Sequence, residues 1–170
     1  MPPSFPSLQT KRPTCTTCLR PQTSCICKWV TPIAHEVEVL ILQHPMEVHQ
    51  AKGSARLLHL CLPHSKLMTG EVFDEQMFES PKHSVLLYPQ SPDDMAQGIS
   101  KPPILAPVFL KNPVQLRLIV LDGTWRKSRK MLYLSPPLRA LPRLSLQDPA
   151  ASSYRIRKAH RPDQLSTLEA

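Results

Sequence analysis

The sequence predicts an α/β protein with a largely parallel sheet, and two observations lead to this fold class. Segments with the apolar pattern of strands alternate along the chain with segments whose apolar residues recur at helical intervals. The length of 170 residues suits one domain with a substantial core. The 20 prolines against 4 glycines also predict stiff, irregular connections between the elements.

The first half of the chain is predicted to hold two strands and one helix. Residues 36–43 begin with alternating apolar residues and end in an apolar run, as in a strand that enters a buried sheet. A His-Pro pair ends this strand. Residues 49–62 space their apolar side chains at helical intervals, and Pro63 stops that helix. Residues 84–88 are predicted to form a second, short strand.

The second half is predicted to contain the central strand. Residues 89–115 are typical of a proline-rich loop, with one brief strand near residues 104–105. Residues 117–121 are strongly apolar and should occupy the middle of the sheet. Residues 143–146 are predicted to form a further strand, which a loop over residues 147–161 follows.

Two helices are also predicted in this half. Residues 124–134 should form a helix that places Met131 and Leu132 inward and leaves a basic face. Ser166 and Glu169 have the S-x-x-E form of a capping box, so a further helix should begin at Ser166.

Four of the five cysteines lie close together near the N-terminus, after a polar, proline-rich segment (residues 1–14) that should be disordered. Their spacing favours a zinc knuckle over residues 15–30, because a C-x2-C pair lets two sulfurs reach one tetrahedral ion. Disulfides and free thiols are the alternatives. With four protein sulfurs as ligands, the metal would be structural rather than catalytic. The predicted ligands are Cys15, Cys18, Cys25 and Cys27.

The formal net charge of +8 is concentrated in residues 117–161, where eleven residues are basic and two are acidic. Such a block favours a polyanionic partner, usually nucleic acid, and a solvated basic surface is the alternative. The helix over residues 124–134 carries cations in its first turns, where the helix dipole disfavours them. Phosphate contacts by Arg126, Lys127 and Lys130 explain that choice more readily than helix stability does.

The sequence shows no targeting or membrane segment. The first fourteen residues contain no apolar stretch, and the longest apolar runs, near residues 39–42 and 118–121, are far too short to span a bilayer. We therefore expect a soluble, cytoplasmic protein without membrane contact. No obligate protein partner is evident.

The segment Asp122-Gly123-Thr124-Trp125 is the best candidate for chemistry. It places an acid at the carboxyl end of an apolar strand, the edge at which ligands of open α/β sheets gather. Gly123 allows a tight turn, Thr124 can cap the following helix, and Trp125 can stack on a base. The alternative is that Asp122 is only a turn acid and Trp125 only a core residue.

His44 and Glu47 form a second polar cluster, which follows the first predicted strand. They are candidates for the region that binds substrate. A hydrogen-bonded pair within a turn is the alternative.

These segments together resemble the DTW-domain family, the tRNA-uridine aminocarboxypropyltransferases. Each shared feature is modest alone, but their order and spacing along residues 15–170 are highly specific. The features are Cys15-x2-Cys18-x-Arg20-Pro21 with Cys25-x-Cys27, His44-Pro45-x-Glu47, Asp122-x-Thr124-Trp125, an arginine-rich loop after Ser153, and Leu165-Ser166-Thr167-Leu168-Glu169-Ala170.

The resemblance implies a fold and an activity. Residues 31–170 would form a catalytic domain related to the SPOUT methyltransferases, with a C-terminal trefoil knot, a rare exception to chain-topology rules. We expect members of the family to continue, beyond the point where this sequence stops, into a further helical segment. The donor would be S-adenosylmethionine and the partner tRNA. The 3-amino-3-carboxypropyl group would move to N3 of a tRNA uridine, with release of 5′-methylthioadenosine.

The resemblance also suggests roles for residues. Asp122 would take the N3 proton as a general base, help that is typically worth about 10²–10⁴ in rate. Alternatively, Asp122 holds the ammonium or sulfonium charge of the donor. The basic helix and a loop with Arg155, Arg157 and Lys158 would contact tRNA phosphates. The donor pocket would be lined by Leu121, Thr124, Trp125, Leu165, Ser166, Thr167, Leu168, Glu169 and Ala170.

Two other functions stand as alternatives. The first is an RNA methyltransferase of the same broad fold, which would release S-adenosylhomocysteine instead of methylthioadenosine. The second is a non-catalytic, zinc-bearing RNA-binding protein, which should not bind the donor.

Overall fold

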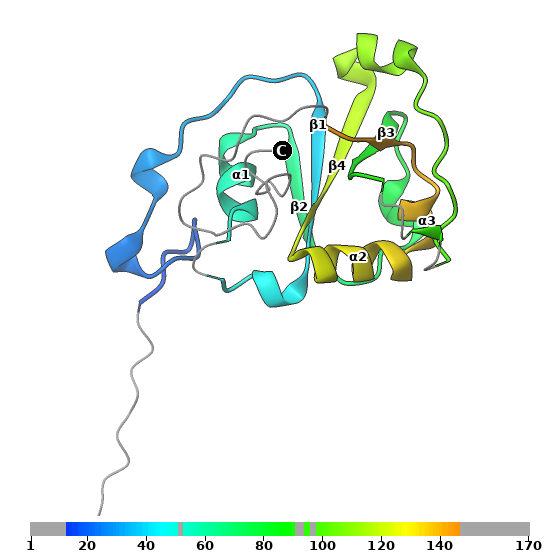
Figure 1. Cartoon of the computed structure of the whole chain (residues 1–170). Helices are drawn as coiled ribbons and strands as arrows, with labels where there is room; N and C mark the ends of the chain where they lie inside the picture. The colour runs from blue at the N-terminus through cyan, green and yellow to red at the C-terminus, as the bar shows by residue number, and fades with distance from the viewer. Residues whose placement is uncertain (1–12, 51–52, 91–93, 96–97, 147–170) are drawn as a thin grey trace, which may run out of the picture.

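The computed structural model of the chain describes residues 13–50, 53–90, 94–95 and 98–146 (Figure 1). Of the segment predicted to be disordered, residues 1–12 lie outside this range, and Thr14 forms an antiparallel bridge with Pro21. Residues 147–170 also lie outside it. The trefoil knot and the helix from Ser166 therefore stay predictions.

The described residues form a five-stranded sheet in which every strand pairing is parallel. The strand order is β2-β1-β4-β3-β5, so β4 lies in the middle, as its apolar run over residues 118–121 predicts. The predicted α/β fold with a parallel sheet is confirmed. The strands are β1 (Glu38–Gln43), β2 (Ser65–Thr69), β3 (His83–Leu87), β4 (Leu116–Asp122) and β5 (Arg143–Leu144).

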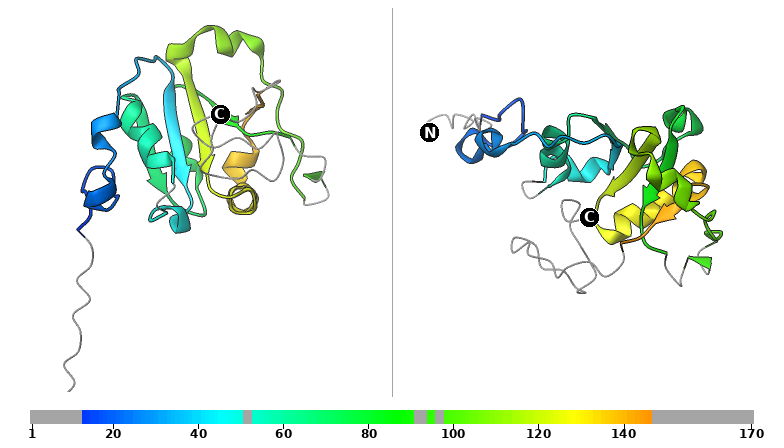
Figure 2. Two further views of the ribbon diagram at one scale, coloured as in Figure 1. Left: turned by 60° about the vertical axis from the view of Figure 1, so that its left-hand side comes forward. Right: turned by 90° about the horizontal axis from the view of Figure 1, so that it is seen from above.

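Helices cover both faces of the sheet, as parallel sheets require. Helix α1 (Ala55–Cys61) packs on one face, and α2 (Trp125–Leu134) and α3 (Pro136–Arg139) contribute to the core on the other (Figures 1 and 2). Helix α2 runs along the edge at which β1 and β4 end (Figure 1). The predicted helix over residues 124–134 is thereby confirmed, with Thr124 as its N-terminal cap.

The core has two layers because successive side chains of a strand point to opposite faces of the sheet. Leu40 of β1 belongs to the same buried cluster as Met131 and Leu132 of α2. The next residue, Ile41, belongs to the cluster that contains Ala55 of α1. Met131 and Leu132 are completely buried, as predicted for the inward side of this helix.

Two elements escape prediction from the sequence. Strand β2 lies at the edge of the sheet, and none of its side chains is buried, so it lacks the apolar pattern of a buried strand. Helix α3 has a single turn and starts with two prolines, which fit the first helical positions but suggest a break in the sequence.

Two predicted elements need correction. The strand predicted near residues 104–105 is wrong: this segment has no regular structure and Ile104 is 89% exposed. Pro102 and Pro103 come directly before it and have no backbone N–H to pair with a neighbouring strand. The helix predicted over residues 49–62 is confirmed only from Ala55 to Cys61.

Glu38 holds the strands together at their amino-terminal edge. Its carboxylate lies 2.8 Å from Arg117 Nη2, 3.4 Å from Lys82 Nζ and 3.7 Å from Lys66 Nζ. Burial opposes ionisation of Glu38, but the charges of these cations outweigh it and lower the pKa of the carboxyl below its ordinary value. One carboxylate thereby connects β1 with β2, with β4 and with the residue before β3.

We expect Glu38→Gln to lower the free energy of unfolding at neutral pH by about 1–3 kcal/mol, because it leaves the buried Arg117 without its ionic partner. Since the folded state lowers the pKa of Glu38, its contribution is present above the ordinary value of 4.5 and is lost as the pH falls through the folded value. Urea denaturation should therefore separate the two proteins at pH 7 and bring them together in acid.

The matched control is Glu36→Gln, which neutralises an exposed carboxylate two residues earlier. Its stability should follow that of the original protein at both pH values. An equal loss in the two variants would contradict the role given to the Glu38 cluster.

Candidate active site and metal centre

Asp122 lies at the carboxyl end of the central strand, directly beside the end of β1. Strand register pairs it with Gln43. Gln43 Nε2 donates a hydrogen bond to Asp122 Oδ2 at 3.0 Å, and the backbone N–H of His44 donates to the carbonyl oxygen of Asp122 at 2.9 Å. Asp122 is only 5% exposed. The carboxylate is therefore buried and held in a fixed orientation at the sheet edge.

The turn after Asp122 is closely packed. A Cβ atom on Gly123 would lie 3.2 Å from Lys127 Cβ, so a larger residue would push against α2. The Thr124 hydroxyl accepts a hydrogen bond from the backbone N–H of Lys127 at 3.4 Å and caps the helix. These contacts fix where α2 and Trp125 begin relative to Asp122.

Trp125 is not a core residue, because 40% of it is exposed. Its ring lies 5.7 Å from that of Tyr88, centroid to centroid, at an angle of 58°. Tyr88 is buried, and its hydroxyl lies 3.3 Å from Ser128 Oγ. Burial raises the pKa of Tyr88. Trp125 is thus supported on one side and leaves ring surface free to stack on a ligand.

His44 bridges a turn of its own and a distant loop. Its Nδ1 accepts a hydrogen bond from the backbone N–H of Met46 at 3.1 Å, and its Nε2 lies 2.9 Å from Glu71 Oε1. Because Nδ1 acts as an acceptor, Nε2 carries the proton. Glu71 also pairs with Lys130 Nζ at 3.0 Å. Hydrogen bonds from Lys130 and His44 lower the pKa of Glu71.

Glu47 also forms an ion pair with a residue of α2. Its Oε1 lies 2.7 Å from Lys127 Nζ, and the Glu47 side chain is only 11% exposed. Glu47 and Glu71 thus offset two cations in the first turns of α2, which explains how the helix tolerates them against its dipole. Arg126 is exposed and forms no ion pair among the residues that the structure describes. Phosphate contacts by these cations stay a prediction.

Sequence reasoning missed two residues of this edge, Gln43 and Glu71. The signal for Gln43 was a polar residue that ends an apolar strand, but only strand register brings it beside Asp122. Glu71 follows β2, a strand that the sequence does not predict, so no pattern connected it with His44 or Lys130.

The four predicted cysteines meet at one point. Their sulfur atoms all lie within 4.8 Å of one another, with 3.7 Å between Cys15 and Cys27 and 3.8 Å between Cys18 and Cys25. Zn–S bonds of about 2.3 Å place the sulfurs of a tetrahedral site about 3.8 Å apart. The separations far exceed the ~2.05 Å of a disulfide. The cluster is therefore a potential metal site compatible with zinc.

Backbone groups favour a thiolate in this cluster. The backbone N–H groups of Cys18 and Thr17 lower the pKa of the Cys15 thiol to about 6. In contrast, the hydrogen bond with Cys25 raises the pKa of Cys27 to about 12. Crowded sulfurs cannot all ionise without a cation, and a bound cation reverses that balance.

Two arginines attach the knuckle to the rest of the protein. Arg20 Nη2 donates to the carbonyl oxygen of Gly53 at 3.3 Å, and Arg56 Nε of α1 donates to the carbonyl oxygen of Thr17 at 2.8 Å. The cysteine cluster is therefore attached both to Gly53, which lies just before α1, and to α1 itself.

Of the remaining predicted site residues, only Leu121 lies within the described part of the chain. Leu121 packs in the buried cluster beneath α2, and its place in a donor pocket stays a prediction. Arg155, Arg157, Lys158 and residues 165–170 lie outside the described residues. Among the described helices, none has the length and apolar character needed to cross a membrane.

Comparison with known proteins gives one family match and several relatives. Residues 12–170 match the DTW domain. The chain is 29% identical to tRNA-uridine aminocarboxypropyltransferase 2 of Macaca fascicularis, over 94% of the chain and 54% of that protein. It is 30% identical to the protein of the same name from Drosophila melanogaster, over 94% of the chain and 64% of that protein.

A plant relative gives a similar picture. The chain is 30% identical to tRNA-uridine aminocarboxypropyltransferase A of Arabidopsis thaliana, over 74% of the chain and 52% of that protein. The chain thus spans between half and two thirds of the length of these curated relatives. No solved structure matches it.

Proposed function

The chain belongs to the DTW-domain family, and from that premise we propose that it is an S-adenosylmethionine-dependent tRNA-uridine aminocarboxypropyltransferase. The observation that carries the proposal is the buried carboxylate of Asp122. It lies at the carboxyl end of the central strand, where ligands of open α/β sheets bind, and Gln43 fixes its orientation.

Asp122 is proposed to act as the general base. S-adenosylmethionine supplies electrophilic carbons on a positively charged sulfur. Asp122 accepts the N3 proton of the uridine, and N3 forms a bond to the γ-carbon of the aminocarboxypropyl group. The bond between that carbon and sulfur breaks, and its electrons leave with 5′-methylthioadenosine. Because a sulfonium has three electrophilic carbons, the alignment of N3 decides which group transfers.

Trp125 and Thr124 are proposed to form part of the donor pocket, together with Leu121 and residues 165–170. The exposed part of the Trp125 ring supports this, since an aromatic face can stack on adenine. The cysteine cluster is proposed to hold structural zinc, which would crosslink the knuckle. A reducing compartment such as the cytoplasm, which keeps thiols reduced, suits a thiolate site of this kind.

The RNA substrate is proposed to be tRNA, with the target uridine outside the helical stack. Its Watson–Crick edge must be exposed for N3 to react, so it should lie in a loop. The basic side chains would contact phosphates and position the RNA rather than read its sequence.

The direct test is incubation of the protein with unmodified tRNA and S-adenosylmethionine labelled in the aminocarboxypropyl group, followed by mass spectrometry. We expect label in a uridine nucleoside and release of 5′-methylthioadenosine. S-adenosylhomocysteine would instead identify a methyltransferase. Absence of both products, together with no calorimetric binding of the donor, would identify a non-catalytic RNA-binding protein.

Neutralising Arg126 and Lys130 together, as Arg126→Gln with Lys130→Gln, should weaken tRNA binding. These residues lie four apart on the exposed face of α2. Loss of two phosphate contacts should reduce the slope of log K against log salt concentration by about 1–2. Fluorescence anisotropy of labelled tRNA over a range of salt concentrations measures this slope.

The matched control removes two exposed lysines from the loop that leads into β4, as Lys101→Gln with Lys111→Gln. Net charge falls equally in the two double variants. If both lower the slope alike, the effect is due to overall charge, and the contact assigned to α2 is wrong.

A further inference from the structure

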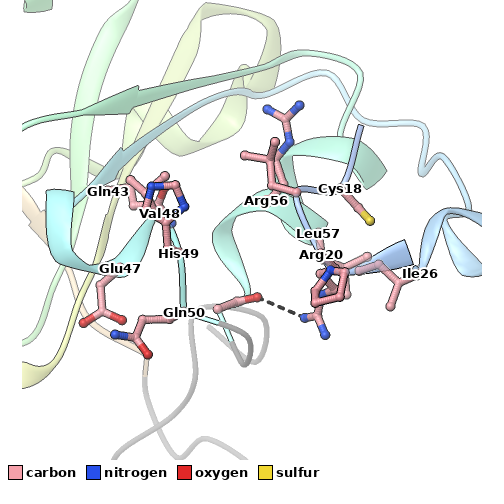
Figure 3. A pocket seen from close by; sticks show the side chains of 13 residues that line it. Cys18, Arg20, Ile26, Gln43, Glu47, Val48, His49, Gln50, Arg56 and Leu57 are labelled. Carbon is pink, nitrogen blue, oxygen red and sulfur yellow. Dashed lines mark hydrogen bonds between the residues drawn. The ribbon is translucent and has the colours of Figure 1, made fainter. Parts of the chain in front are cut away.

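A cavity of about 140 Å³ lies between the metal knuckle and the edge of the sheet (Figure 3). The knuckle contributes Cys18, Leu19, Arg20, Pro21 and Ile26, and the body of the protein contributes Gln43, residues 47–50, Gly53, Arg56 and Leu57. Figure 3 shows Gln43, Val48 and His49 on one side and Cys18, Arg20 and Ile26 on the other. A purely structural role of the knuckle gives no reason for a cavity between the knuckle and the sheet.

One hydrogen bond connects a residue of the cavity lining with the proposed base, Asp122. Gln43 lines it, and the same Gln43 side chain donates to Asp122 Oδ2 at 3.0 Å. A group that enters the cavity therefore approaches Asp122 from the side of β1. No other strand intervenes, because β1 and β4 are neighbours in the sheet.

Trp125 is connected to the opposite side of Asp122. Its ring packs against Tyr88, the residue that follows β3, and β3 is the other neighbour of β4. The sheet order thus separates two approaches to one carboxylate: the cavity on the β1 side and the exposed aromatic ring on the β3 side. A two-substrate transfer needs such an arrangement, because donor and acceptor must meet from different directions.

The lining of the cavity suits a flat ring with a polar edge. Apolar side chains come from the knuckle (Leu19, Pro21 and Ile26) and from the body (Val48 and Leu57). Gln43 and Gln50 supply amide groups, which can donate and accept hydrogen bonds. The lining also includes Arg20, Arg56, His49 and Glu47, so that polar and apolar side chains occur in similar numbers. Ligand sites combine apolar walls with polar groups that fix orientation.

The size and charge of the cavity favour a nucleobase of RNA over the whole donor. Pockets for drug-sized ligands are roughly 300–1,000 Å³, so a space of about 140 Å³ suits one small ring. Arg20 uses only Nη2 within the described residues, for the carbonyl oxygen of Gly53. Its other N–H groups are suited to a phosphate beside the base.

We propose that this cavity receives the target pyrimidine of the RNA substrate, with the metal knuckle as one wall and Arg20 as the contact for a neighbouring phosphate. This inference rests on the proposed function and identifies where the acceptor binds. It makes the knuckle part of the RNA site, so that metal loss would weaken acceptor binding while donor binding persists.

Photocrosslinking tests the location directly. The probe is an unmodified tRNA transcript in which 4-thiouridine replaces uridine, irradiated with the metal-loaded protein and analysed by peptide mass spectrometry. We expect crosslinks in peptides that contain residues 18–26 or 43–50, and we expect excess unlabelled tRNA to suppress them. Crosslinks confined to other peptides would overturn the proposal.

Filling the cavity tests its role in binding. We expect Val48→Phe to raise the KM for tRNA about tenfold or more, while calorimetry gives an unchanged Kd for S-adenosylmethionine. Val114→Phe is the matched control, because Val114 is half exposed and precedes β4 at the opposite edge of the sheet. Weaker donor binding with unchanged tRNA kinetics in Val48→Phe would place the donor, not the acceptor, in the cavity.

Arg20→Gln supplies a second variant that leaves the apolar walls intact. We expect it to weaken tRNA binding and to suppress the crosslinks, with zinc content and melting temperature as checks on the knuckle. Lys111→Gln makes the same change of charge at the opposite edge of the sheet. It should retain both tRNA binding and the crosslinks. Equal RNA binding by Arg20→Gln and Lys111→Gln would show that Arg20 does not contact the RNA.

The two proposals fail in different ways. If the protein transfers no group but crosslinks in the cavity, the cavity binds RNA and the proposed reaction is wrong. If transfer occurs and the crosslinks lie elsewhere, the reaction stands and the acceptor site is wrong.

Discussion

Asp122→Asn should lower the rate of group transfer by about 10²–10⁴, while the Kd for S-adenosylmethionine stays within several-fold. Asparagine has nearly the same shape and can still accept the hydrogen bond from Gln43 Nε2. It cannot take the N3 proton. Single-turnover kinetics with tRNA would measure the chemical step, and calorimetry would measure donor binding.

Asp74→Asn is the control, because Asp74 is an exposed acid that caps a short helix (Glu75–Phe78), a position where asparagine serves equally well. Its transfer rate should be unchanged. Retained turnover in Asp122→Asn would remove the general-base assignment. A large loss of donor affinity would instead indicate that Asp122 holds the positive charge of the donor.

Replacing Cys15 and Cys18 together by serine should release the metal and lower the melting temperature. Structural zinc contributes about 10–16 kcal/mol of binding free energy in zinc-finger peptides, and this short segment has little core of its own. Loss of the knuckle would also remove the contacts from Arg20 to Gly53 and from Thr17 to Arg56. Elemental analysis and differential scanning calorimetry give the two readouts.

Cys61→Ser provides the matched control, since Cys61 ends α1 and is not part of the four-sulfur cluster. It should retain full metal content. An unchanged metal content in the double variant would rule out the site. Metal loss without any change of melting temperature would show that the knuckle does not stabilise the domain.

Strongly patterned elements were predictable from the sequence. The apolar runs of β1 and β4 and the helical spacing of Met131 and Leu132 follow from burial, which acts on each segment separately. Strand β2 could not be recognised because an edge strand with exposed side chains lacks that pattern. The order of the strands depends on contacts between distant segments, which no local pattern records.

The residues of the candidate site were likewise predictable only where a local sequence pattern marks them. The cluster of four cysteines was predictable because their spacing along a short segment lets the sulfurs meet. Asp122 was predictable because an acid after an apolar strand marks the sheet edge. Gln43 and Glu71 were not, because their partners lie far away in the sequence. The ion pairs of Lys127 and Lys130 were likewise invisible, since the carboxylates come from other elements.

The Glu38 cluster has a practical consequence for engineering. It lies at the opposite end of β1 from Gln43, which at about 3.3 Å per residue is roughly 17 Å away. Thermostability can therefore be raised or lowered by redesigning charges around Glu38 without disturbing the proposed site at the other end of the strand. The usual trade-off between robustness and turnover should be weak for substitutions at that end.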